Sequence, residues 1–330
     1  MSNYLVTGCA GFIGSVVTER LLRDGHTVTG VDNLNDYYDI RLKEYRLARL
    51  RDQVGLRDVR GDIEDRASLR KVFEEGGAFD AVVNLAARTG VRASLRDPGS
   101  YLATNVMGTL HLLELSREYG VPKFVLASTS SLYAGQKMPF REELPVNTPI
   151  SPYAVSKKGA EILAYTWHYL YGIDVSVVRY FTVYGPAGRP DMSIFRFIRW
   201  IAEGETVVLF GDGTQSRDFT YVEDVARGTV AALRRVGFAT VNLGSDSPHT
   251  LNEVIGRIEK LAGKQAVIEH RDFPRTDVPA TWAHIGKARE LLGWQPEVSL
   301  GEGLRRTVEW YLEHRGFAKT LSLDEFPGRC

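Results

Sequence analysis

The chain has 330 residues, enough for one large domain or two closely joined ones and for a sizeable hydrophobic core. Its 41 Lys and Arg residues balance 41 Asp and Glu residues, so neither a nucleic-acid-binding surface nor intrinsic disorder is expected. No apolar run reaches the roughly 18 residues of a membrane span, and the first residues lack the pattern of a secretory signal. Two cysteines, Cys9 and Cys330, cannot by themselves form a disulfide framework or a metal site. We therefore expect a soluble, cytoplasmic protein without a metal ion.

Short β-branched runs alternate with helical patterns in the first half of the chain. Strands are predicted at Tyr4–Thr7, Thr27–Val31, Ala81–Leu85, Phe124–Ala127 and Val175–Arg179. Between the first two, Ser15–Asp24 has a helical pattern that ends at Gly25. The alternation predicts an α/β fold with a doubly wound parallel sheet, that is, a Rossmann fold.

A change in composition after Tyr184 indicates a second, smaller α/β region. Glycine and proline are frequent at 185–190, whereas Tyr221–Leu233 has a helical pattern and Thr240–Leu243 a strand pattern that could return to the first sheet. The predicted division places 1–184, with 220–245, in a nucleotide-binding domain, and 185–219 with 246–330 in a C-terminal substrate domain. Thr320–Cys330 is expected to be a loose tail.

A glycine-rich segment, Gly8-Cys9-Ala10-Gly11-Phe12-Ile13-Gly14, follows the first predicted strand and opens the first helix. In this context, glycines let the backbone approach a pyrophosphate, although a plain tight turn is the alternative. Asp32 ends the second predicted strand, where its carboxylate can accept both hydrogens of a ribose diol. Asn33, not Arg, follows it, so a 2′-phosphate would meet a carboxylate with no nearby cation. The segment therefore predicts NAD rather than NADP as cofactor.

Other predicted strand ends bring residues to the same edge of the sheet. Asp62-Ile63 is expected beside the adenine, and Leu85-Ala86-Ala87 beside the nicotinamide ribose. The hydroxyl cluster Ser128-Thr129-Ser130-Ser131 follows an apolar strand and can hydrogen-bond a substrate alcohol. Any one of these hydroxyls could instead cap or line a turn.

Tyr153 and Lys157 lie one turn apart at the start of the helical stretch Tyr153–Tyr171. A phenol has an ordinary pKa of about 10, so it needs a nearby positive charge to act as a base at neutral pH. We expect Lys157 and a nicotinamide cation to supply that charge. The alternative is an aromatic packing face, because the same stretch also carries four other aromatic residues, Tyr165, Trp167, Tyr169 and Tyr171.

Taken together, these motifs resemble the extended short-chain dehydrogenase/reductase family acting on nucleotide sugars, over nearly the whole chain. Three longer segments resemble the UDP-glucuronate 4-epimerases in particular: 32–39 (DNLNDYYD), 90–95 (GVRASL) and 179–192 (RYFTVYGPAGRPDM). The resemblance implies a tightly held NAD, a UDP-sugar in the cleft, and a homodimer joined through a four-helix bundle. Tyr101–Tyr119 and Tyr153–Tyr171 are the candidate helices for that bundle.

The resemblance also implies site residues. Cofactor-binding candidates are Gly8, Gly11, Phe12, Ile13, Gly14, Asp32, Asn33, Asp62, Ile63, Leu85, Ala86, Ala87, Asn105, Tyr153, Lys157 and Tyr180. Substrate-binding candidates are Arg92, Thr129, Ser130, Ser131, Thr182, Arg189, Arg217 and Asp277. Three of these have simpler readings: Arg217 could pair with Asp218 or Glu223 at the surface, Asp277 could organise the turn before Pro279, and Arg189 could be an exposed partner of Asp191.

The implied reaction is a reversible oxidation at C4 of the sugar. Tyr153 takes the 4-hydroxyl proton, the hydride goes to NAD⁺, the 4-keto sugar rotates, and hydride and proton return on the other face. Thr129 would bridge the 4-oxygen and Tyr153, Lys157 would bind the nicotinamide ribose, and Ser130 and Ser131 would contact the sugar or its carboxylate.

Competing functions remain open on the sequence alone. UDP-glucuronate decarboxylases resemble this chain but place a Glu where it has Ser131, and 4,6-dehydratases place an Asp-Glu pair where it has Ser130-Ser131. UDP-glucose 4-epimerases have Asn where it has Thr182. Non-catalytic NAD(P) sensors of this fold typically lack the Tyr and Lys pair. The chain also differs from the pattern of the family that it resembles at Asn84, Ala134 and His284, and no role is assigned to His284.

Overall fold

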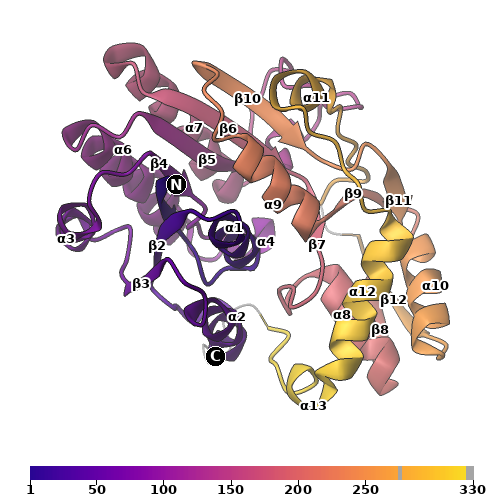
Figure 1. Cartoon of the computed structure of the whole chain (residues 1–330). Coiled ribbons are helices and arrows are strands. Elements are labelled where there is room, and N and C mark those ends of the chain that lie inside the picture. Colours follow the sequence, from indigo (N-terminus) through magenta and orange to yellow (C-terminus); the bar gives the residue numbers. More distant parts are fainter. Residues whose placement is uncertain (274–276, 325–330) are drawn as a thin grey trace.

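The computed structural model describes residues 1–273 and 277–324. Seven strands form the main sheet: β1 (Asn3–Thr7), β2 (Thr27–Asp32), β3 (Leu56–Arg60), β4 (Ala81–Asn84), β5 (Lys123–Thr129), β6 (Asp174–Tyr180) and β10 (Phe238–Leu243). Their order is β10-β6-β5-β4-β1-β2-β3, and all neighbouring strands are parallel (Figure 1). This confirms the predicted doubly wound sheet. The order reverses between β1 and β4, which is where such sheets bind ligands.

Alternating apolar residues explain why these strands are buried on both faces. In β5, Phe124 and Leu126 belong to one hydrophobic cluster, whereas Val125 and Ala127 belong to another on the opposite face. All four are nearly inaccessible to solvent. Successive side chains of a strand point to opposite faces, so a continuous apolar run produces a strand covered on both sides.

Helices supply that cover in two layers (Figure 1). One layer contains α1 (Phe12–Arg23), α2 (Ile40–Arg51), α9 (Val222–Ala231) and α11 (Gly286–Leu292). The other contains α3 (Arg66–Gly76), α6 (Gly108–Glu118) and α7 (Pro152–Tyr171). The first helix starts at Phe12, three residues before the predicted Ser15, because the glycine segment itself leads directly into it.

The predicted helix Tyr101–Tyr119 is three consecutive elements rather than one. It comprises α5 (Pro98–Leu102), a π-helical turn η1 (Ala103–Met107) and α6, and the short helix α4 (Val91–Ser94) precedes them. The π turn contains Asn105, whose carbonyl accepts a hydrogen bond from Thr109 Oγ1 at 2.7 Å. Such a bulge is invisible to hydrophobic periodicity and commonly marks a functional segment.

The second region is built from two small sheets and the remaining helices, beyond the carboxyl end of the main sheet (Figure 1). The sheets pair β11 (Pro248–Thr250), β9 (Ser216–Tyr221) and β7 (Thr182–Tyr184), and β12 (Val267–Arg271) with β8 (Thr206–Phe210). The helices are α8 (Ser193–Glu203), α10 (Leu251–Ala262), α12 (Leu300–Glu313) and α13 (Arg315–Ala318). Ile198, Val254 and Leu304 are buried in one cluster between α8, α10 and α12.

The chain returns from this region to the main sheet through α9 and β10. β10 pairs with β6 along its whole length, with Val241 opposite Val178. This confirms that the stretch Thr240–Leu243 is a strand of the first sheet. The two regions are therefore interleaved in sequence.

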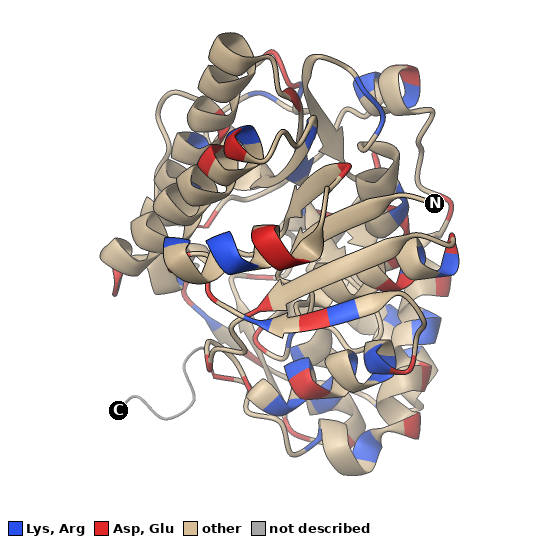
Figure 2. Cartoon of the chain, turned by 60° about the vertical axis from the view of Figure 1, so that its left-hand side comes forward, with Lys and Arg blue, Asp and Glu red and all other residues tan. Residues whose placement is uncertain are grey.

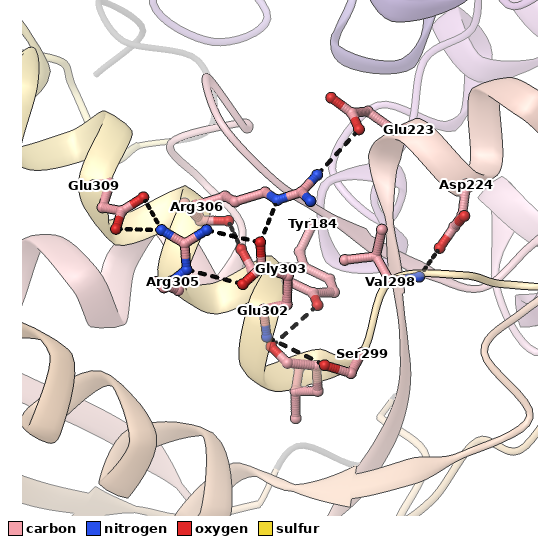
Figure 3. A network of polar contacts seen from close by, with 12 residues as sticks. Tyr184, Glu223, Asp224, Val298, Ser299, Glu302, Gly303, Arg305, Arg306 and Glu309 are labelled. Carbon is pink, nitrogen blue, oxygen red and sulfur yellow. Dashed lines mark hydrogen bonds and ion pairs between the residues drawn. The ribbon is translucent and has the colours of Figure 1, made fainter.

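A polar network fastens α12 to α9 (Figure 3). Ser299 caps α12 by accepting from the Glu302 N–H at 3.3 Å. Arg306 reaches from α12 to Glu223 at 3.3 Å, and the Asp224 carboxylate accepts from the Val298 N–H at 2.9 Å. Because α9 also packs on α1, this network joins the second region to the helical layer of the main sheet.

The beginning of the predicted C-terminal tail is packed rather than loose. Leu321 is 1% exposed, the Arg41 guanidinium donates to the Thr320 carbonyl at 2.7 Å, and the Ser322 N–H donates to Asp39 at 3.0 Å. Burial of Leu321 holds this segment against the protein, although the Pro and Gly residues later in the sequence had favoured a loose tail. Residues 325–330 lie outside the described part of the chain.

Charges of both signs are distributed over the ribbon without a large region of one sign (Figure 2). This agrees with the balanced composition. Among the described residues, no helix has both the length and the apolar character needed to cross a membrane.

Candidate active site

The glycine segment forms a tight cradle at the end of β1. Gly8 has a φ of +72°, and a Cβ there would lie 2.8 Å from the backbone nitrogen of Ala86. The Gly11 N–H donates to the Gly8 carbonyl at 2.9 Å, and a Cβ on Gly14 would lie only 1.9 Å from that same carbonyl oxygen. Only glycine fits these positions, and the N-terminus of α1 follows at once. The segment therefore has the shape and the N–H donors that a pyrophosphate requires, which fits NAD.

Asp32 lies at the end of β2 and is held by the backbone. Its two carboxylate oxygens accept from the Ala10 N–H at 3.2 Å and from the Leu34 N–H at 2.8 Å. The charge of Asp32 also acts on the ammonium of Lys43, which is 5% exposed. Burial lowers the pKa of Lys43 to about 8, and the Asp32 charge opposes that shift. Lys43 donates to the Asn35 side chain at 2.7 Å.

The residues predicted beside the adenine lie together after β3. The Asn33 side chain donates to Asp62 at 2.8 Å, so two strand ends are tied to each other. Ile63 is 3% exposed and packs so closely on Gly108 that a Cβ there would lie 2.6 Å from it. This arrangement leaves an apolar wall of the kind that an adenine ring requires.

The segment after β4 meets the glycine cradle. The Ala86 N–H donates to Thr7 Oγ1 at 3.3 Å, and the Thr7 hydroxyl donates to Asn84 at 2.7 Å. Leu85 and Ala87 flank Ala86. The sequence-predicted set Leu85, Ala86 and Ala87 therefore lies at the point where the strand order reverses.

Asn105 and Tyr180 are held by other protein groups. Asn105 is 2% exposed, and its side chain bonds to both backbone groups of Arg88 and, at 2.8 Å, to Ser156. The Tyr180 hydroxyl lies 2.8 Å from Thr229 on α9. These contacts fix the walls of the site, and neither side chain projects a spare polar group in the described structure.

Tyr153 and Lys157 occupy the first two turns of α7. Ser151 caps the helix by accepting from the Ala154 N–H at 3.2 Å, which places the phenol and the ammonium against the end of β5. Tyr153 is 9% and Lys157 5% exposed, and Lys157 donates to the Ala127 carbonyl at 2.8 Å. Tyr165 and Tyr169, farther along α7, are half or more exposed. Tyr153 is therefore set apart from the remaining aromatic residues of the helix.

Burial shifts the pKa values of both Tyr153 and Lys157. Burial raises the pKa of the Tyr153 phenol, while a hydrogen bond with Thr129 and the charge of Arg189 lower it. Burial also lowers the pKa of Lys157 to about 8, and Glu161 opposes this shift. Arg189 is thus one cation that acts on the phenol of Tyr153, and the role expected for Lys157 and the nicotinamide stays a prediction.

One hydroxyl of the cluster, that of Ser128, is bonded within the protein core, whereas the other three can contact a ligand. Ser128 donates to Glu161 at 2.6 Å and belongs to a buried network with Arg179, whose guanidinium bonds both Glu161 oxygens at 2.8 Å. Thr129 ends β5 and lies 3.1 Å from the Ser131 hydroxyl. Ser130 and Ser131 begin the 3-10 turn η2 (Ser130–Tyr133) and are partly exposed. Thr129, Ser130 and Ser131 therefore remain able to contact a ligand beside Tyr153.

Arg189 is largely enclosed, with 15% of its side chain exposed, contrary to the simpler reading as an exposed ion pair. Its guanidinium bonds Asp191 at 2.5 Å and the Thr89 hydroxyl, and lies over the rings of Tyr37 and Tyr38 at 5.3 and 5.7 Å. A small pocket lies between Phe12 on one side and Thr182 and Arg189 on the other. The predicted substrate residues Thr182 and Arg189 thus face the start of α1.

A second charged group lies farther out, formed by Arg92, Arg217 and Asp277. Arg92 bonds one Asp277 oxygen at 2.8 Å, and Arg217 lies 3.6 Å from the other. Arg92 also covers the ring of Phe210 at 4.5 Å. Arg217 pairs neither with Asp218 nor with Glu223, and Asp277 has two cationic partners, so neither simpler reading describes these residues.

Sequence reasoning missed Lys43 and Arg46 of α2. Arg46 is 4% exposed and bonds the Ala10 carbonyl at 3.3 Å and the Ala187 carbonyl at 2.6 Å. The Arg-rich sequence of α2 is typical of a solvated helix, which hides these two buried cations. The sequence signal that could have found them is Asp39, a residue typical of a helix N-cap. It fixes the start of α2 and so places Lys43 and Arg46 on one face of the first two turns.

Comparisons with known proteins agree with this geometry. The model of the NAD dependent epimerase/dehydratase family matches residues 4–244. A UDP-glucuronate 4-epimerase of Thermodesulfobacterium geofontis is 55% identical over 98% of this chain and 100% of its own length. The crystal structure of a Bacillus cereus UDP-glucuronic acid 4-epimerase, in complex with UDP-glucuronic acid and NAD, is 37% identical with a TM-score of 0.88, covering 94% of this chain and 99% of that one.

A Thermotoga maritima UDP-glucose 4-epimerase, solved with UDP-glucose, is also similar, with 34% identity, a TM-score of 0.87 and coverage of 95% of this chain and 99% of that one. The similarity to the epimerases solved with UDP-glucuronic acid and with UDP-glucose extends over almost the full length of the chains. The family model covers more than two thirds of the residues, including the glycine cradle, Tyr153 and Lys157. The chain therefore belongs to the NAD dependent epimerase/dehydratase family.

Proposed function

We propose that this protein interconverts UDP-glucuronate and UDP-galacturonate by NAD-dependent epimerisation at C4. The observation that carries the proposal is the buried phenol of Tyr153, which lies within hydrogen-bond reach of Thr129 and within the field of Arg189. One small ligand can therefore contact both a proton acceptor, Tyr153, and a cation, Arg189. The relatives named above support UDP-glucuronate as that ligand.

In the proposed reaction, Tyr153 removes the proton of the 4-hydroxyl and later returns it. Thr129 holds the phenol and the sugar 4-oxygen in one line, and Lys157, anchored on the Ala127 carbonyl, orients the nicotinamide ribose. NAD, when bound, supplies the hydride acceptor for C4. The glycine cradle and Asp32 hold the cofactor, and the protein's task between the two half-reactions is to let the 4-keto sugar turn without releasing it.

Arg189 is proposed to bind the sugar carboxylate together with Thr182, Ser130 and Ser131. The Nε–Nη2 edge of its guanidinium is bonded to Asp191, so the substrate carboxylate would take a charge-assisted hydrogen bond from Nη1, whereas the 6-hydroxyl of UDP-glucose carries no counter-charge. Two serines also replace the acidic groups that elimination of water would require. These features favour epimerisation of the uronate over epimerisation of glucose, decarboxylation or dehydration.

The UDP moiety is assigned to the outer charged group. Arg92 and Arg217 can pair with the diphosphate, and Asp277 can accept hydrogen bonds from the nucleoside. In this proposal, residues 1–184 with 220–245 form the NAD-binding domain, and 185–219 with 246–330 form the UDP-sugar-binding domain.

We also propose a cytoplasmic homodimer. Four large side chains on α7 are exposed to between 51% and 75%, namely Ile162, Tyr165, Tyr169 and Leu170. An exposed apolar stripe on a long helix is typical of a helix that packs against a partner. The preceding α5 and η1 add Leu102 and Met107, exposed to 43% and 46%, beside α7.

The decisive experiment incubates the purified protein with UDP-glucuronate and identifies the product by NMR. UDP-galacturonate with no net change in NADH is the expected result. UDP-pentose would instead establish a decarboxylase, and turnover of UDP-glucose alone would establish a glucose epimerase. Absence of any turnover by protein with bound NAD would contradict an enzymatic function.

A further inference from the structure

The most unusual buried group outside the reaction centre is the guanidinium of Arg46. It is 4% exposed, yet among the described residues it forms no ion pair with a carboxylate. Its partners are neutral oxygens, and it lies over the rings of Phe12 and Tyr38 at 5.6 and 5.5 Å. A buried cation without a counter-ion is costly, so its retention requires a role that compensates for the cost.

The partners of Arg46 come from three separate segments. Nη1 donates to the Ala10 carbonyl at 3.3 Å and to the Tyr38 hydroxyl at 2.6 Å. Nε and Nη2 both donate to the Ala187 carbonyl, at 3.0 and 2.6 Å. Ala10 lies in the glycine cradle, Tyr38 in the segment after β2, and Ala187 in the loop after β7. One side chain thus fastens three segments that surround the cofactor cradle.

Arg46 bonds two backbone carbonyls, those of Ala10 and Ala187, that belong to conformationally restricted segments. The Ala10 peptide is held on each side, because Asp32 accepts from its N–H at 3.2 Å while Arg46 donates to its carbonyl. Ala187 has a φ of +51°, a left-handed conformation that is unfavourable for a residue with a Cβ. The bidentate grip of Arg46 on its carbonyl stabilises that conformation. Without Arg46, the loop after β7 would lose the contact that holds its strained residue in place.

We propose that Arg46 is a clasp that retains NAD in the protein, by locking the loop after β7 onto the glycine cradle. The inference rests on the NAD dependence of the family and does not require a particular sugar. The 4-keto sugar has to be reduced again after it rotates. An epimerase of this mechanism must therefore retain its cofactor until the reaction is complete. Arg46 acts through the loops and is therefore a positioning residue.

The same loop carries Arg189, only two residues after Ala187. Arg189 bonds Thr89 and Asp191 and acts electrostatically on Tyr153. The clasp consequently joins the cofactor cradle to the residue proposed to hold the sugar carboxylate. Release of NAD requires all three segments to separate, which makes Arg46 a barrier to dissociation more than a direct ligand.

The test measures exchange of bound NAD in the absence of any sugar. Protein loaded with labelled NAD is chased with unlabelled NAD, and the label remaining on the protein is followed with time for wild type, Arg46→Met and Arg49→Met. Arg49 lies on the same helix with a side chain 56% exposed, which makes it the matched control. We expect exchange at least about tenfold faster in Arg46→Met, from the loss of several charge-assisted hydrogen bonds, and no change in Arg49→Met.

A second readout separates retention from folding. Turnover of Arg46→Met at saturating added NAD should recover to within a few-fold of wild type, whereas protein stripped of free NAD should lose activity with time. Exchange within about twofold of wild type in a folded Arg46→Met protein would overturn the proposal.

If Arg46→Met does not fold, Tyr38→Phe carries the test. This variant keeps the ring under the guanidinium and removes one of its three acceptors. Exchange several-fold faster than wild type is the expected result, and unchanged exchange would refute the clasp. Since no sugar is present in the two exchange assays, a wrong substrate assignment would leave the exchange rates unaffected.

Discussion

Arg189 and Asp191 form a buried ion pair in which guanidinium Nη2 and carboxylate Oδ2 are 2.5 Å apart. The carboxylate neutralises the cation inside the protein, at the modest sequence distance of two residues. A sugar carboxylate entering beside Tyr153 can then join an arginine whose orientation is already fixed by Asp191, Thr89 and two tyrosine rings. Preorganisation of this kind reduces the cost of ordering a long side chain on binding.

Replacing Arg189 with Ala should therefore discriminate between two substrates. We expect kcat/KM for UDP-glucuronate to fall by about 10- to 150-fold, the equivalent of one charge-assisted hydrogen bond of roughly 1.5–3 kcal/mol. UDP-glucose should be affected much less. Initial rates with both substrates test this, and an equal fall with both, or no fall with either, would exclude the carboxylate role.

Tyr153→Phe should abolish most turnover while leaving the fold intact. The phenylalanine keeps the edge-to-face contact with Tyr101 at 6.2 Å but has no proton to exchange. A loss of at least about 10²-fold in kcat is expected for removal of a positioned acid and base. Tyr165→Phe, on the exposed part of the same helix, is the control. Near-normal turnover of a folded Tyr153→Phe protein would assign Tyr153 to packing alone.

The pH profile of kcat should have an alkaline limb that belongs to Lys157. Burial lowers the pKa of this ammonium to about 8, so its charge is present below that pH and is lost as the pH rises through it. Burial raises the pKa of the Tyr153 phenol, so the fraction of phenolate, and with it the activity, should still rise with pH below that range. A bell-shaped profile is expected. In Lys157→Met the alkaline limb should disappear from the residual activity, and its persistence would contradict this assignment.

Asp32→Ala should weaken NAD binding and reduce discrimination against NADP. The variant removes the acceptor of the ribose diol and the carboxylate that would repel a 2′-phosphate, while the cation of Lys43 remains. We expect NAD affinity to fall by about 10- to 150-fold, in line with a charged hydrogen bond, with a smaller change for NADP. Asp58→Ala is the control, because Asp58 lies on the neighbouring strand β3 and forms an ion pair with Arg51 at the end of α2. Equal titration curves for NAD in wild type and variant would refute the role.

The sequence predicts the scaffold of the site better than its electrostatics. Glycine spacing, the end of β2 and the Tyr153 and Lys157 pair are local patterns, and each lies where the pattern indicates. Arg189, whose charge lowers the pKa of the Tyr153 phenol, is distant from it in sequence and lies in the loop after β7. Likewise, no periodicity reveals that Arg46 is buried, because its acceptors are carbonyls distant in sequence. Side-chain pairing across loops depends on tertiary packing, which residue spacing alone does not encode.

The position of β10 has a consequence for how this protein is made. During synthesis, β6 lacks a partner on one edge until β10 emerges about sixty residues later, which takes several seconds at the usual ribosomal rate of roughly 5–20 residues per second. For that interval a hydrophobic strand presents unpaired backbone groups, the surface on which nascent chains aggregate. A gene fragment ending at Tyr184 would remain in that state permanently. We therefore expect a fragment that ends at Tyr184 to be less soluble than the full chain.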